Sequence, residues 1–296
     1  MKPFAEHLDV SEFRIPMEPI PERVERAITE RIEEVVAGTQ GIRRLTSRSM
    51  LGGSMVRLDA VPLLESGFTL SPEAAAALEC WQARPGEIVT VVDPEFSFYR
   101  ARLSALDSGR GAIVPFHRFN RPVESQVGIE VYQALPQKER FELVLQKLTE
   151  IGVSRIVPYT SSRSTTPEER DGGQKKSHRW PDVILRAARQ CRRAMLPELS
   201  PVLDWEAAVY EAGQADLKLM LYEGETHMTL REAMQGVHTN RVALLVGPEG
   251  GFTGEELDVA GNIGFLPVSL GPRILRTESA AIVGAALLQY ELGDLG

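Results

Sequence analysis

The chain has 296 residues, of which 43% are hydrophobic and 25% charged, and its formal net charge at pH 7 is −8. This composition is typical of a globular protein with room for two domains, and the negative charge argues against a protein that coats nucleic acid non-specifically. The apolar runs are shorter than the roughly 20 residues that a membrane-spanning helix needs, and the N-terminus lacks the apolar core of a signal peptide. We therefore expect a cytoplasmic protein that does not enter a membrane.

The cysteine and histidine residues do not form a pattern that binds metal. Cys80 and Cys191 lie far apart in the sequence, and the five histidines are scattered without ligand spacing. Structural zinc sites and redox dithiols place their cysteines or histidines a few residues apart. We therefore expect neither a disulfide framework nor a catalytic metal.

Residues 1–54 are expected to form an N-terminal extension that carries no motif. Prolines interrupt its start, residues 22–36 are expected to be helical, and Gly52-Gly53 ends it. Residues 55–120 have short β-branched and apolar runs separated by turn residues, such as Ile88–Val92 followed by Asp93-Pro94. Ser71 and Pro72 mark the start of one short helix. This pattern predicts a small β-barrel over residues 55–120.

From residue 121 onward the pattern changes to strands that alternate with helices, with Arg121-Pro122 at the boundary. The expected strands are Val127–Leu135, Arg155–Tyr159, Leu217–Tyr222, Val242–Val246 and Leu266–Leu270. The expected helices are Lys138–Ile151, Pro181–Met195, Thr229–Gln235, Thr253–Ala260 and Thr277–Leu292. This alternation predicts that residues 121–296 form an α/β domain, in which helices cover both faces of a parallel sheet.

In such a sheet the ligand binds beyond the carboxyl ends of the strands, so the loops 222–228, 247–252 and 271–276 are expected to meet. The loop Gly247-Pro248-Glu249-Gly250-Gly251 has no lysine, Pro248 has no N–H to donate, and Glu249 would repel an anion. It therefore suits a neutral or cationic ligand, such as a nucleoside or a sulfonium, better than a phosphate. The alternative is that its glycines only form a tight turn.

The next loop and its helix carry Arg273, Arg276, Thr277 and Glu278. Thr277 is expected to cap the last helix, and Glu278 is favourable in its first turn. Surface exposure alone would account for either arginine, but two of them beside an acid at a strand end also indicate a site.

A basic helix lies within this acidic protein. Along the expected helix Pro181–Met195, one face carries Arg186, Arg189 and Arg193, and Arg192 adjoins them. Like charges at this spacing repel one another, which favours an anionic partner such as RNA phosphate. The alternative is that nearby acids, such as Glu139 or Glu198, pair with these arginines.

Six motifs, taken together and in order, resemble those of the RsmE-type small-subunit rRNA (uridine-N3)-methyltransferases of the SPOUT superfamily. They are Pro136–Glu142, Gln146–Val153, Arg179-Trp180, Ala187–Gln190, Gly247–Gly251 and Leu270–Glu278. The resemblance covers roughly residues 121–296, and it implies a C-terminal SPOUT trefoil-knot domain, a preceding PUA-like RNA-binding barrel and a homodimer. It further implies that S-adenosylmethionine is the cofactor and that ribosomal RNA or the small ribosomal subunit is the partner.

The resemblance also implies residue roles. The expected cofactor-binding residues are Leu221, Tyr222, Glu223, Val246, Gly247, Pro248, Glu249, Gly250, Gly251, Leu270, Gly271, Pro272, Ile274, Leu275 and Arg276. The RNA-binding residues, Arg186, Arg189, Arg192 and Arg193, are expected from the charge of the basic helix and not from the resemblance. Because methyl transfer to uracil N3 must remove an imide proton, Arg276 is expected to stabilise charge on the uracil, Glu278 to act as the base and Arg163 to orient the RNA.

This chain departs from the family in two places. Residues 74–87 retain little of the barrel motif beyond Arg84, Pro85 and Gly86. In the basic helix, Arg189 and Arg192 stand where an acid and a small residue are usual in the family. These departures leave two alternatives open. One is a SPOUT methyltransferase with a different RNA target, and the other is an RNA-binding relative without catalysis.

Overall fold

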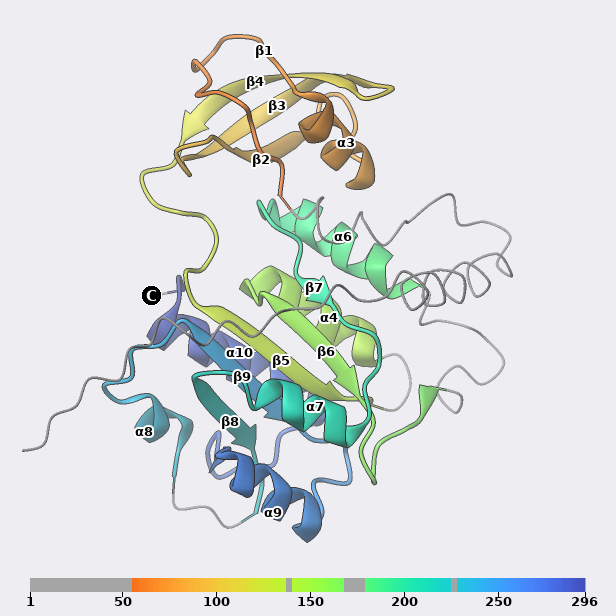
Figure 1. Cartoon of the computed structure of the whole chain (residues 1–296), viewed down its shortest axis with the longest axis vertical. Coiled ribbons are helices and arrows are strands. Elements are labelled where there is room, and N and C mark those ends of the chain that lie inside the picture. The colour runs from red at the N-terminus through yellow and green to blue at the C-terminus, as the bar shows by residue number, and fades with distance from the viewer. Residues whose placement is uncertain (1–54, 137–139, 168–178, 225–227, 296) are drawn as a thin grey trace, which may run out of the picture. The chain divides into compact units, whose positions relative to one another are not determined.

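The structure is a computed structural model, and it describes residues 55–136, 140–167, 179–224 and 228–295. All of them lie within one compact unit, Ser47–Gly296, which contains two separate β-sheets (Figure 1). The expected N-terminal extension, residues 1–54, lies outside the described residues.

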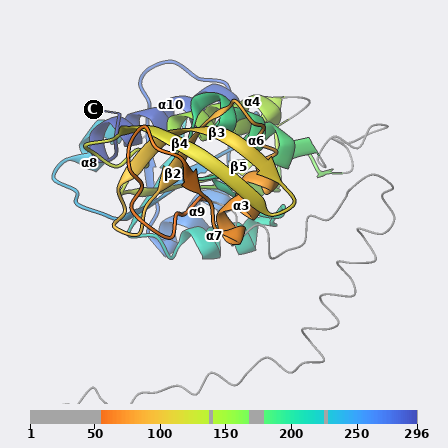
Figure 2. The same cartoon turned by 90° about the horizontal axis from the view of Figure 1, so that it is seen from above.

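The first sheet is antiparallel, with the strand order β1-β4-β3-β2. Its elements are β1 (Phe68–Thr69), α3 (Pro72–Cys80), β2 (Ile88–Val92), β3 (Phe98–Asp107) and β4 (Arg110–Arg118), and Figure 2 shows β4, β3 and β2 side by side. The predicted start of α3 is confirmed, because Ser71 accepts a hydrogen bond from the backbone N–H of Ala74. Helix α3 buries Ala74, Ala75 and Leu78 against the strands, which gives this sheet a core of its own.

The second sheet is parallel throughout, with the strand order β10-β8-β9-β5-β6-β7. Its strands are β5 (Gly128–Ala134), β6 (Arg155–Tyr159), β7 (Glu198–Leu199), β8 (Leu217–Leu221), β9 (Arg241–Val246) and β10 (Leu266–Val268). The central strands β5 and β9 are almost wholly buried, as expected for a sheet covered on both faces. The predicted parallel sheet is confirmed.

Helices pack on both faces of this sheet. They are α4 (Arg140–Ile151), α6 (Trp180–Cys191), α7 (Trp205–Ala212), α8 (Leu230–Met234), α9 (Gly254–Ile263) and α10 (Thr277–Leu292). One apolar core contains residues of α4, α6, α8 and α10, and another contains residues of α7 and α9. The sequence did not predict β7 and α7, although Asp204 caps α7 by accepting from the backbone N–H of Ala207.

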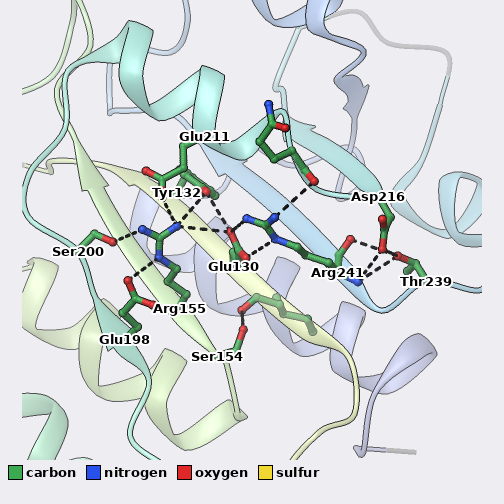
Figure 3. A network of polar contacts seen from close by, with 12 residues as sticks. Glu130, Tyr132, Ser154, Arg155, Glu198, Ser200, Glu211, Asp216, Thr239 and Arg241 are labelled. Carbon is green, nitrogen blue, oxygen red and sulfur yellow. Dashed lines mark hydrogen bonds and ion pairs between the residues drawn. The ribbon is translucent and has the colours of Figure 1, made fainter. Parts of the chain in front are cut away.

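Charged side chains at the amino ends of the strands form one network (Figure 3). Glu130 of β5 accepts from Arg241 of β9 at 2.6 Å and from the hydroxyl of Tyr132 at 3.0 Å. Arg155 of β6 pairs with Glu130, Glu198 and Glu211. This network joins the starts of four parallel strands, β5, β6, β7 and β9, so the loops at their other ends are the ones available for a ligand.

Candidate active site

A cavity of ≈ 480 Å³ lies beyond the carboxyl ends of β8, β9 and β10. Its lining is Leu221, Tyr222, Glu223, Gly224, Val246, Gly247, Pro248, Glu249, Val268, Ser269, Leu270, Gly271, Pro272, Arg273, Ile274, Leu275, Arg276, Thr277 and Ala280. The three loops that the sequence places at one sheet edge therefore meet. Of the residues predicted to bind the cofactor, Gly250 and Gly251 do not line the cavity and all the others do.

The glycines of the loop after β9 leave room for neighbouring side chains. A Cβ on Gly247 would lie 2.9 Å from the ring of Phe252, and one on Gly251 would lie 2.2 Å from a carboxylate oxygen of Glu223. Gly251 also has a φ of 66°, which residues with a side chain rarely adopt. The first part of this loop lines the cavity, and its last two glycines make the turn that brings Glu223 close.

Thr277 does not cap α10 as expected. The N-cap residue is Arg276, and its side chain makes no capping hydrogen bond. The Thr277 hydroxyl instead donates to the carbonyl of Gly247 at 2.5 Å and accepts from the amide of Gln133 at 2.9 Å. Thr277 therefore joins the start of α10 to the loop after β9 and to the end of β5.

Glu278 is buried beside this cavity but does not line it. One carboxylate oxygen of Glu278 lies 3.7 Å from Arg140, whose guanidinium also binds Glu249 at 3.2 Å. The other oxygen of Glu278 has no hydrogen-bond partner among the described residues. A buried carboxylate oxygen without a donor is costly, which sets Glu278 apart from the other buried acids near this cavity.

Arg163 lies outside the cavity and stabilises the loop after β9 by hydrogen bonds to its backbone. Its guanidinium donates to the carbonyls of Gly250 at 2.8 Å and of Phe252 at 3.4 Å. Of the three residues predicted to be catalytic, only Arg276 lines the cavity, while Glu278 lies beside it and Arg163 holds the backbone of one of its loops.

The expected helix to Met195 ends earlier, because α6 stops at Cys191, and the four arginines predicted for it lie in different environments. Arg186 and Arg192 are exposed, and Arg189 pairs at 2.6 Å with Glu87 of the first sheet. Arg193 is buried, bound to Glu124 at 2.8 Å and to the carbonyls of Thr149 and Val153. The Arg193 guanidinium is occupied by these partners, so Arg193 has a structural role and the structure argues against its prediction as an RNA ligand. Glu198 pairs with Arg155, and Glu139 lies outside the described residues.

The described part of the chain holds no cluster of three metal-ligating side chains and no helix long and apolar enough to cross a membrane. The profile of a family described as RNA methyltransferase domain matches residues 123–289, which include the whole parallel sheet and all three cavity loops.

The chain belongs to this RNA methyltransferase family.

Several relatives of this chain have the name of the enzyme family that its motifs resemble. Ribosomal RNA small subunit methyltransferase E of Mycobacterium bovis is 32% identical over 206 residues, which cover 68% of this chain and 77% of the relative. The protein of the same name from Buchnera aphidicola (subsp. Schizaphis graminum) is 33% identical over 176 residues, covering 58% of this chain and 69% of the relative. The resemblance to the RsmE-type family is confirmed.

Two solved structures share the fold and were determined with S-adenosylmethionine bound. A methyltransferase from Legionella pneumophila is 33% identical with a TM-score of 0.58, over 81% of this chain and 98% of its own. Ribosomal RNA small subunit methyltransferase E from Neisseria gonorrhoeae is 27% identical with a TM-score of 0.59, over 82% of this chain and 99% of its own.

The sequence did not predict that Arg140 of this methyltransferase domain contacts Glu249 and Glu278 beside the cavity. Arg140 begins α4, the helix that follows β5, and β5 lies next to β9 in the sheet. The rule that loops after neighbouring strands converge could have placed Arg140 beside Glu249. Its contact with Glu278 needed the position of α10, which the sequence pattern does not give.

Proposed function

We propose that this protein is an S-adenosylmethionine-dependent methyltransferase that modifies N3 of a uridine in small-subunit ribosomal RNA. The observation that carries this proposal is the cavity built by three post-strand loops inside an RNA methyltransferase domain. Relatives that carry the name of a small-subunit rRNA methyltransferase, and neighbours solved with S-adenosylmethionine, support it.

The chemistry of the cavity fits this cofactor. Leu221, Leu270 and Leu275 offer apolar surface for an adenine ring, and the carboxylates of Glu223 and Glu249 suit ribose hydroxyls or a cationic sulfonium. No lysine is among the lining residues, as expected for a ligand without phosphate. When bound, S-adenosylmethionine supplies an electrophilic methyl group, so no metal is needed for the transfer.

The residues of this chain have to position the uracil and take up its N3 proton. Arg276, exposed at the rim of the cavity, is placed to stabilise negative charge on the uracil carbonyls. Glu278, with one unpartnered oxygen, is the candidate base. Arg163 acts through the loop that it braces, so we assign it a positioning role.

We further infer that the sheet region β8–α10 forms a SPOUT trefoil knot and that the protein works as a homodimer in the cytoplasm. In support of the knot, the chain leaves β10 at the sheet edge and returns to pack α10 against α4, β5 and β9. The outer face of α10 exposes Val283, Leu287 and Tyr290 at helical spacing, and a second copy would bury them.

We assign the first sheet, within residues 55–120, to a PUA-like RNA-binding domain, and residues 121–296 to the methyltransferase domain. The support for this division is that each sheet has its own apolar core. Arg186 and Arg192 remain the proposed RNA contacts of α6.

The test is methyl transfer from labelled S-adenosylmethionine to isolated small subunits, compared with naked rRNA and tRNA. We expect transfer to small subunits, and nuclease mapping should place the methyl group on uridine N3. Transfer to tRNA alone would indicate a SPOUT enzyme with a different target, and cofactor binding without transfer to any RNA would indicate a non-catalytic relative. If Arg276→Ala and Glu278→Gln both keep the full rate at unchanged cofactor affinity, the catalytic assignment is wrong.

A further inference from the structure

A second cavity, of ≈ 610 Å³, lies between strand β2 of the first sheet and helix α6. It shares no lining residue with the cavity at the strand ends. The wall formed by the first sheet is mainly apolar, with Val56, Trp81 and Val89, but also carries Arg102, and the wall formed by α6 and the residues after it is basic. The basic residues that line it are Arg102, Arg186, Arg189, Arg192 and Arg193.

The two walls of this cavity are held together by direct contacts. Glu87 next to β2 pairs with Arg189 of α6 at 2.6 Å. The carbonyl of Arg192, at the end of α6, accepts from the hydroxyl of Thr90 at 2.8 Å and from Arg100 at 2.5 Å. The cavity is therefore formed before any ligand enters, which lowers the entropy cost of binding.

The positive charge of the cavity is not neutralised by the described residues. Arg189 and Arg193 have carboxylate partners, whereas Arg102 and Arg186 donate to the backbone carbonyls of Gly86 and Asp182 at 3.4 and 3.1 Å. No carboxylate of the described chain forms an ion pair with Arg102, Arg186 or Arg192. Burial and the neighbouring Arg192 both lower the pKa of Arg100, in keeping with excess positive charge here.

The backbone of Arg192 gives an independent indication. Arg192 is the C-cap residue that follows α6, and its backbone is in the left-handed conformation, with φ at 60°. Glycine is the usual residue at such a position because a Cβ is strained there. A long basic side chain placed at a strained helix end, on the rim of a basic cavity, is consistent with a functional use of that side chain.

We propose that this cavity binds one unpaired nucleotide of the RNA substrate, with its base against the apolar wall and its phosphate among Arg102, Arg186 and Arg192. The volume is in the range of nucleotide-sized sites, and an unpaired nucleotide can turn its base out of the helical stack to reach such a cavity. This inference rests on the proposed function in one respect, namely that the substrate is RNA. It adds an anchoring site away from the methyl transfer itself.

The experiment compares the Arg102→Gln/Arg192→Asn variant with the wild type and with Arg110→Gln. Asparagine is chosen because it tolerates the left-handed conformation, and Arg110 is a matched exposed arginine of the same sheet outside the cavity. For the double variant we expect KM for small-subunit RNA to rise on the order of tenfold per arginine, with unchanged kcat and unchanged affinity for S-adenosylmethionine. The RNA-binding constant should also depend less on salt. In a plot of its logarithm against the logarithm of the salt concentration, the magnitude of the slope should fall by about 0.7 per arginine removed.

Crosslinking of RNA that contains 4-thiouridine, followed by mass spectrometry, locates the contact directly. We expect crosslinks to peptides that contain Gly86–Thr90 or Arg186–Arg192. An unchanged KM in a folded double variant, an equal rise in Arg110→Gln, or crosslinks only elsewhere would each overturn the proposal. Failure of the wild-type protein to methylate or bind any RNA would instead refute the proposed function.

Discussion

The hydroxyl of Thr277 donates a 2.5 Å hydrogen bond to the carbonyl of Gly247, thirty residues earlier in the chain. This bond joins the first residue of α10 to the first residue of the loop after β9, and both residues line the cavity at the strand ends. Two of the three loops that form the proposed cofactor site are thereby held at a fixed separation.

Replacement of Thr277 by valine, which keeps the shape and removes the hydroxyl, should weaken S-adenosylmethionine binding on the order of tenfold. The reason is that the Gly247 carbonyl and the Gln133 amide both lose a buried partner, at a cost of about 1–2 kcal/mol. Isothermal titration calorimetry measures the affinity, and Thr277→Ser, which keeps the hydroxyl, is the control. Equal affinities for the valine and serine variants would contradict the prediction.

Replacement of Arg140 by alanine should lower kcat/KM between about tenfold and a hundredfold. The Arg140 guanidinium contacts the carboxylates of both Glu249 and Glu278, so its loss removes a positive charge that Glu278 shares with Glu249 beside the cavity. Single-turnover methyl transfer measures the effect. Arg140→Lys keeps the charge and should recover part of the rate, and a lysine variant as slow as the alanine variant would argue against an electrostatic role.

Glu124→Ala should lower the free energy of unfolding by about 3–5 kcal/mol, because it leaves Arg193 buried without its counter-charge. Glu124 also accepts from the backbone N–H groups of Ala194 and Met195, which would lose their partner. Urea denaturation followed by circular dichroism measures the change. In the control Glu150→Ala, which removes the surface pair with Lys147, the change should stay below about 1 kcal/mol.

Stability should fall as the pH rises above about 10. Burial, reinforced by Glu130, raises the pKa of the Tyr132 phenol, and burial raises that of Tyr159 as well. Above the pKa of an unfolded tyrosine, about 10, the unfolded chain releases these protons while the folded chain retains them, so the unfolded state is favoured. Each proton contributes a slope of about 1.4 kcal/mol per pH unit.

The measurement for this pH dependence is urea denaturation from pH 8 to 11, with Tyr132→Phe beside the wild type. The phenylalanine variant lacks one of the titrating phenols, so its stability should decline less steeply above pH 10. Parallel declines in the two proteins would show that Tyr132 does not contribute.

Leu287→Glu should reduce the molar mass in solution to that of one chain. A carboxylate in the middle of the exposed apolar face of α10 would have to be buried in the proposed dimer, which costs more than the interface gains. Size-exclusion chromatography with light scattering measures the mass. Val259→Glu, which changes an exposed apolar residue of α9, is the matched control and should leave the dimer intact.

The sequence by itself determined the alternation of strands and helices and the edge of the sheet where loops would meet. Local periodicity was sufficient for this, because Arg155–Tyr159 and Thr277–Leu292 carry patterns that mark their own ends, and both observed elements have these bounds. The loop after β9 carries Glu249 and no lysine, and this local feature was enough to indicate a neutral or cationic ligand. The strand β7 was missed, since two residues of strand give no periodicity. The short helix α7 that follows it was missed as well.

Only the tertiary structure decided what the charged residues touch. On helical spacing alone, Arg189 and Arg193 belong with Arg186, yet one of them binds Glu87 and the other is buried against Glu124. Thr277 has the sequence context of a helix cap, but it binds Gly247 instead. The physical reason is that a side chain's partner depends on which distant segments the fold brings within hydrogen-bond distance, and local sequence specifies the face of an element without specifying what packs on it.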